Sequence, residues 1–208
     1  MNVYFYGHSN YICMLSRLFC LAFIVLVFSS FSSDPIERIG IKGPFTFNQT
    51  QFKLAWTAKP NDFYYIQEYL PAGETPEKFN QMITFYLLDK NVEVKAAVSQ
   101  KVKELENRKK TDPTCNYVVS ESPDGKEFIV DFILSESKGN ELSTVEFNVY
   151  RYQRVEIQPN QPGVLVCAYS KRAYDNEITT FLNRLKEDRM AFINEMISLN
   201  IPTVKLSK

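Results

Sequence analysis

The chain has 208 residues, 45% of them hydrophobic and 14% aromatic, and its 24 basic side chains balance its 24 acidic ones. This balance excludes the clustered positive charge with which proteins usually bind nucleic-acid phosphates, so no nucleic-acid partner is expected. The sequence contains no glycine-rich phosphate loop and no metal-ligand spacing, so we expect neither a cofactor nor a metal.

Residues 1–33 have the pattern of a secretory signal peptide. Arg17 precedes an apolar block at residues 18–28, and serines follow it, with a cleavage site after Ser32. The block is shorter than the roughly 20 apolar residues of a membrane span, so we expect cleavage and a secreted or periplasmic product. An uncleaved anchor that tethers the domain to a membrane is the alternative. A signal peptide of ordinary length would also begin at Met14, so a translation start at that residue is an alternative to Met1.

Loss of the signal peptide would remove His8, the only histidine of the chain. The remaining domain could then build neither a Ser-His-Asp or Cys-His nucleophile nor a histidine-containing zinc site. Enzymes that work with two carboxylates stay possible, because glycosidases need only a pair of acids.

The first half of the domain, which spans residues 34–208, predicts a hairpin followed by a helix. Residues 34–43 form a flexible lead-in, and the strands of the hairpin cover 52–57 and 63–70. Thr75 is a helix N-cap residue followed by proline and an acid. The helix that it begins would bury a stripe at three- and four-residue spacing, made of Phe79, Met82, Ile83, Tyr86 and Leu87.

The second half predicts a charged helix, four strands and a final helix. The first helix covers 91–110 and ends before Pro113. The final helix covers 175–199, with Asp175 or Asn176 as its cap. The strands cover 115–120, 127–135, 142–156 and 164–169, the second of them central and buried on both faces. This order predicts an α+β fold in which an antiparallel sheet of about six to seven strands packs against helices.

The segment at residues 69–83, YLPAGETPEKFNQMI, resembles the strand-to-helix junction of PsbP-like and DcrB-like exported proteins. The resemblance implies an α/β sandwich and a non-enzymatic binding or accessory role. By motif it covers about residues 52–88, and the charged helix at 91–110 departs from the family pattern. No functional residue of that family maps to this chain.

Aromatic and basic side chains alternate at Tyr150, Arg151 and Tyr152, as they do on surfaces that stack sugars or bases. Strand faces carry the same residue types for packing alone, so the structural interpretation stays open. Together with Trp56 and Tyr64 these three residues are the candidate ligand contacts.

Asp131 lies within the apolar run at residues 129–134, which suggests burial and a raised pKa. Neutralisation by a lysine or arginine across the sheet is the structural alternative. The acid is the basis of a second hypothesis, a carboxylate-dependent hydrolase of envelope polysaccharide.

Cys115 and Cys167 are the thiols left after the signal peptide, and export suggests a disulfide between them. Their strands would lie three places apart in a meander, about 14 Å, whereas a disulfide tolerates about 7 Å between Cα atoms. We therefore expect two buried free thiols rather than a disulfide.

The favoured function is an exported binding or accessory protein without catalysis, with an unidentified protein or envelope component as its partner. Cell fractionation with mass measurement tests the export step: a soluble product shortened to about Ser33 is expected, because the serines after the apolar block fit a cleavage site. A full-length product in the membrane fraction would favour the anchored alternative.

Overall fold

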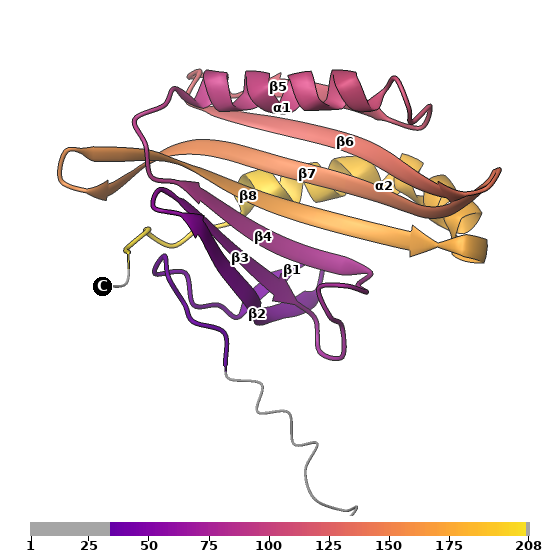
Figure 1. Cartoon of the computed structure of the whole chain (residues 1–208), viewed down its shortest axis with the longest axis horizontal. Coiled ribbons are helices and arrows are strands. Elements are labelled where there is room, and N and C mark those ends of the chain that lie inside the picture. The colour runs from indigo at the N-terminus through magenta and orange to yellow at the C-terminus, as the bar shows by residue number, and fades with distance from the viewer. Residues whose placement is uncertain (1–33, 207–208) are drawn as a thin grey trace, which may run out of the picture. The chain divides into compact units, whose positions relative to one another are not determined.

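The computed structural model describes residues 34–206, and Figure 1 shows the unit that begins at Pro35. The predicted signal peptide, with His8, Cys13 and Cys20, lies outside the described residues. Within the described part of the chain, neither helix combines the length and apolarity needed to cross a bilayer.

The unit is an antiparallel sheet of eight strands with two α-helices. The strands follow the order β1-β2-β3-β4-β8-β7-β6-β5 and curl into a half-barrel. The α+β class is confirmed, but the sheet has more strands than predicted. In chain order the elements are β1 (Phe45–Phe47), β2 (Thr50–Asn61), β3 (Tyr64–Leu70), β4 (Gln81–Leu88), α1 (Val94–Arg108), β5 (Asn116–Glu121), β6 (Glu127–Lys138), β7 (Glu141–Gln158), β8 (Gln161–Tyr174), a 3-10 turn (Asp175–Glu177) and α2 (Ile178–Ser198).

Helix α2 covers one face of the sheet, behind β7 and β8 in Figure 1. Residues opposite one another on neighbouring strands point to the same face, so Phe85 and Cys167 form a row with the other inward residues of β4 and β8. They pack with Phe192 and Met196 of α2 in the larger hydrophobic core. A short 3-10 turn precedes α2, and the predicted caps Asp175 and Asn176 both lie in that turn, whereas Glu177 occupies the N-cap position of the helix.

Helix α1 lies on the opposite face, along β6 and β7 (Figure 1). Its apolar side, with Val94, Val98 and Leu105, packs on Phe128 and Phe132 of β6 in a second core. Strands β3 and β4 belong to the same sheet but lie beyond the helix (Figure 1). One helix therefore covers only part of this face.

The predicted burial of the strand at 127–135 is confirmed, although β6 lies next to the edge strand rather than at the centre of the sheet. Its alternate residues face different helices: Val130 packs in the core under α1, and Ile129 packs in the core under α2. The strand is apolar on both faces because a helix packs against each face.

The predicted helix beginning at Thr75 is wrong, because four of its five stripe residues lie in strand β4 and the fifth, Phe79, lies just before that strand. The Glu74 carboxylate accepts hydrogen bonds from the amides of Asn80 and Gln81 at 2.7 and 3.1 Å, and Thr75 pairs with Lys78, so the segment turns tightly. A strand buried on both faces is apolar at almost every position, which also satisfies a helical spacing. The motif that carried the PsbP-like resemblance is therefore a strand-turn-strand segment.

The predicted hairpin at 52–70 is confirmed as β2 and β3, whereas the lead-in before it is ordered. Ile39 and Ile41 are completely buried in the core under α2. Gly40 between them has φ +79°, and a Cβ there would lie 2.9 Å from the Lys205 amide nitrogen. The glycine permits the chain to pass closely beside the C-terminal segment.

Asp112, just after α1, fixes the end of this helix to the sheet. The acid is 4% exposed and accepts hydrogen bonds from the amide and hydroxyl of Ser135 on β6, both at 2.7 Å. Arg108, in the last turn of α1, donates to Asp112 at 3.2 Å and to the Ser135 carbonyl at 2.6 Å. Burial raises the pKa of Asp112, but the bonds from Ser135, Arg108 and Thr114 outweigh it and hold the pKa below its ordinary value.

Asp112→Asn should lower the free energy of unfolding by about 1–3 kcal/mol at neutral pH, because a buried charged acceptor is lost. The folded pKa lies below the unfolded value, so the carboxylate stabilises the fold above pH 3.8 and this contribution disappears as the pH falls further. The difference between native and variant protein in urea unfolding should therefore shrink in acid. Asp62→Asn, at an exposed position, is the control. An equal effect of both substitutions would contradict the role of Asp112 in fixing α1 to the sheet.

Candidate functional site

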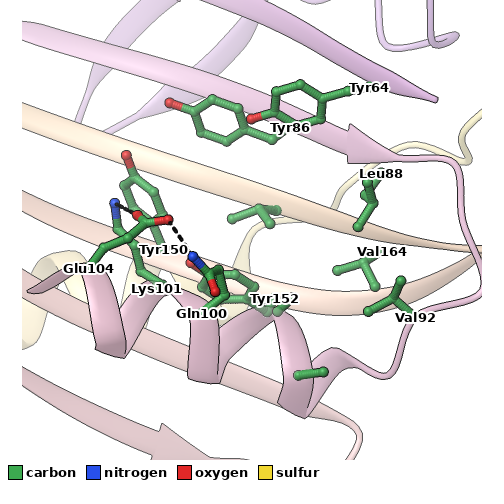
Figure 2. Close-up of a pocket in the computed structure, with 13 residues that line it drawn as sticks. Tyr64, Tyr86, Leu88, Val92, Gln100, Lys101, Glu104, Tyr150, Tyr152 and Val164 are labelled. Carbon is green, nitrogen blue, oxygen red and sulfur yellow. Dashed lines mark hydrogen bonds and ion pairs between the residues drawn. The ribbon is translucent and has the colours of Figure 1, made fainter. Parts of the chain in front are cut away.

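A cavity of about 540 Å³ lies between α1 and the part of the sheet that this helix leaves uncovered. We call it the α1 groove; Figure 2 shows its lining side chains. Its floor comes from β3, β4, β7 and β8, and one wall comes from α1 with the segment before it. The lining residues are Tyr64, Tyr86, Leu88, Val92, Ala96, Ala97, Gln100, Lys101, Glu104, Tyr150, Tyr152, Val164 and Val166.

Strand register brings the floor residues together from distant parts of the chain. Tyr86 on β4 lies opposite Val166 on β8, and Val166 lies opposite Tyr152 on β7. Tyr64 and Leu88 form another pair, between β3 and β4. Opposite residues share a face, so these side chains all point towards α1.

Four tyrosines form an almost continuous aromatic surface in the groove. The rings of Tyr64 and Tyr86 are nearly parallel, at 6° with centroids 6.4 Å apart. The ring of Tyr150 follows at 6.0 Å from Tyr86, and Tyr152 lies 6.4 Å from Tyr150. Tyrosine offers an apolar ring and a polar tip, so this surface can contact apolar and hydrogen-bonding groups together.

Three polar side chains of α1 lie at one end of the groove (Figure 2). The Lys101 ammonium lies 3.5 Å from the Glu104 carboxylate, and the Gln100 amide donates to that carboxylate at 3.5 Å. The ammonium also lies 5.2 Å from the centre of the Tyr150 ring. Lysine and glutamate therefore neutralise one another at this end.

The tyrosine hydroxyls of the groove are held in their neutral form. Burial raises the pKa of Tyr64 to about 12, with further contributions from Tyr86 and Glu104. Burial is also the largest cause of the raised pKa of Tyr86, Tyr150 and Tyr152. At neutral pH the groove thus presents uncharged phenols, each of which can donate or accept a hydrogen bond.

The structure brings three of the five candidate ligand contacts together, because Tyr64, Tyr150 and Tyr152 line the groove. Trp56, on β2, lies on the same face of the sheet and opposite Glu68 of β3, but it is not a lining residue. Its side chain is 42% exposed. Arg151 does not join this set.

Arg151 points to the other face, where it binds the end of α2. Its guanidinium donates to the carbonyls of Met196, Ile197 and Leu199 at 3.0–3.1 Å. It also forms a two-bond ion pair with Glu127, at 2.8 and 3.1 Å. A cation at a helix C-terminus satisfies free carbonyls and interacts favourably with the helix dipole, so this arginine supports the fold.

Asp131 also faces α2 rather than the groove. Both of its carboxylate oxygens accept hydrogen bonds from Arg189 of α2, at 2.7 and 2.9 Å, and the acid is 3% exposed. Burial raises its pKa, and the arginine acts in the opposite direction. An arginine therefore pairs with the acid, as the structural alternative expected, but it comes from α2 rather than from across the sheet. Neither carboxylate oxygen of Asp131 faces the groove.

Cys115 and Cys167 are free and buried in different cores. Cys115 precedes the edge strand β5, and two strands separate β5 from β8, where Cys167 lies. Burial raises the pKa of the Cys167 thiol to about 12, so the thiol is unreactive at neutral pH.

Sequence reasoning missed Tyr86 and the polar wall of α1. Tyr86 was assigned to the stripe of a helix that does not exist, and Gln100, Lys101 and Glu104 have the pattern of an ordinary solvated helix face. The available signal for a strand was the enrichment of aromatic and β-branched residues in the short apolar run that contains Tyr86.

Glu104 is the one carboxylate among the described residues that line the groove. A carboxylate pair, as a glycosidase requires, is therefore not assembled there. Across residues 34–206, no cluster of histidine, cysteine or acidic side chains has the arrangement of a metal site. The groove offers shape, aromatic surface and neutral hydrogen-bonding groups.

A model of a family of uncharacterised proteins matches residues 39–201 of the chain. The match covers all eight strands and both helices. No curated protein and no solved structure matches the chain.

Alkaline titration followed by near-ultraviolet absorbance should show that the groove tyrosines remain neutral at pH 10, where an exposed tyrosine is half ionised. Tyr64→Phe should remove one ionisation at about pH 12 and leave the signal near pH 10 unchanged. The folded pKa lies above the unfolded value, so this neutral phenol stabilises the fold below pH 10 and the contribution is lost as the pH rises towards 12. Circular dichroism at each pH verifies folding, and loss of signal near pH 10 in the variant would contradict burial of Tyr64.

Proposed function

We propose that this chain, which belongs to the uncharacterised family matched over residues 39–201, is a secreted or periplasmic, non-enzymatic binding protein whose small ligand lies in the α1 groove. The observation that carries the proposal is the groove itself, a cavity of about 540 Å³ with a floor of aromatic and aliphatic side chains. Small-molecule sites typically enclose about 300–1,000 Å³ and combine apolar walls with a few polar groups.

The construction of the groove supports binding. Its floor is a hydrogen-bonded sheet, and its wall is a helix whose end is fixed by the buried Asp112. A site on rigid elements is formed before the ligand arrives, which lowers the entropy lost on binding. The side chains of Ala96 and Ala97 on α1 are small, so space remains between the helix and the floor of the groove.

The chemistry of the groove supports a role without catalysis. Its phenols are neutral at physiological pH, and its lysine is paired with its glutamate. A general base or nucleophile needs a pKa matched to its task and a partner that activates it. Tyr64, with a pKa of about 12, is far from that range.

Occupancy of the groove can be tested by filling it. Ala96 is exposed on α1 and lines the groove, so Ala96→Trp should place an indole in the cavity at little cost to the fold. Binding of a neutral solvatochromic naphthalene ketone, followed by fluorescence, should be saturable in the native protein. The variant should bind it at least about 10-fold more weakly, which corresponds to 1.4 kcal/mol.

Ser99→Trp is the matched control, because Ser99 is exposed on the same helix and is not among the lining residues. It adds the same indole outside the groove and should leave the affinity within about twofold of native. Equal binding by native protein and Ala96→Trp would place the probe elsewhere and remove the basis of the proposal.

A further inference from the structure

The lining of the α1 groove is polarised along its length. Leu88, Val92 and Val164 lie together at one end, and Lys101 and Glu104 lie at the other (Figure 2). The tyrosine floor connects the two ends. A ligand that satisfies both ends must have an apolar body and a polar head, because burying a polar group against the aliphatic end would leave it without hydrogen bonds.

The charges at the polar end select the kind of head. Lys101 is the only cation and Glu104 the only anion among the described lining residues, and they lie 3.5 Å apart. An anionic head that approached Lys101 would have to compete with Glu104, and a cationic head that approached Glu104 would have to compete with Lys101. Either charged head would also lose hydration.

An uncharged head meets no such competition. It can donate to the Glu104 carboxylate or accept from the Gln100 amide, both of which line this end. The Tyr150 ring lies 5.2 Å from the Lys101 ammonium, and its hydroxyl, which interacts with that of Tyr86, can still accept a hydrogen bond. Hydroxyl and ester groups fit this mixture of donors and acceptors.

We infer that the α1 groove selects uncharged amphiphiles, with the apolar body against Leu88, Val92 and Val164 and a hydroxyl- or ester-bearing head beside Lys101 and Glu104. The inference rests on the proposed function, since it names the ligand class of the same groove. The Lys101–Glu104 ion pair is the selective element, and each member excludes the head that the other would attract.

Displacement of the naphthalene probe by three amphiphiles that share a ten-carbon chain tests this selectivity. Monodecanoyl glycerol has an uncharged head, decanoate an anionic head and decylammonium a cationic head. Below their aggregation concentrations, the native protein should bind the glycerol ester at least about 5-fold more tightly than either ion.

Removing one member of the ion pair should change the preference in a defined direction. Glu104→Gln frees the Lys101 ammonium, so decanoate should bind about 5-fold more tightly than to native protein, the factor that corresponds to an exposed ion pair. Lys101→Gln frees the Glu104 carboxylate and should improve decylammonium binding by a similar factor. Lys103→Gln and Glu106→Gln change the same charges on α1 outside the lining set, and they should leave all three affinities unchanged.

Each outcome has a separate meaning. Tighter binding of decanoate or decylammonium by native protein, or unchanged preferences in both pair variants, would overturn the inference about the head. Absence of displacement by all three compounds would overturn the amphiphile class. In each of these cases the probe would still bind, and its sensitivity to Ala96→Trp would continue to support an occupied groove.

Discussion

The buried contact between Asp112 and Ser135 determines where α1 can lie, and the groove depends on that position. The contact joins the end of the helix to β6, near one edge of the sheet. At its other end α1 packs in the second core through Val94 and Val98, and the exposed ion pair of Glu93 with Arg154, at 3.5 Å, contributes little in water. The helix consequently follows β6 and β7 and leaves the floor beside it open.

The two faces of the sheet are covered by helices to different extents. On one face α2, the segment before β1 and the segment after α2 seal a large core, supported by Arg151 at the helix end and by the Asp131–Arg189 pair. On the other face a single helix covers only part of the width. Side chains on the uncovered part contact both protein and water, and tyrosine suits that position because its ring is apolar and its hydroxyl is polar.

Most of the sheet and both true helices could be predicted from the sequence, some from a strand or helix period and others, such as β6, from a short apolar run bounded by turn residues. The prediction failed at β4, where burial on both faces removed the alternation that marks a strand, and a proline and an acid after Thr75 imitated a helix start. The candidate tyrosines of β3 and β7 could be chosen as aromatic residues on strands. Their proximity to Tyr86 and Lys101 could not be predicted, because it depends on the strand order and on the placement of α1.

Amphipathic tyrosines on an open sheet would be expected even without a ligand, so the aromatic surface alone does not define a site. The wall makes the difference. Because α1 stands beside the floor, the same tyrosines line a cavity, and the small side chains of Ala96 and Ala97 keep it open. Larger apolar residues there would have filled this space and buried more apolar area. A binding site requires a space of this kind, between a fixed helix and a rigid floor and with a neutralised charge pair at one end. Close packing of the sheet and helix does not require such a space.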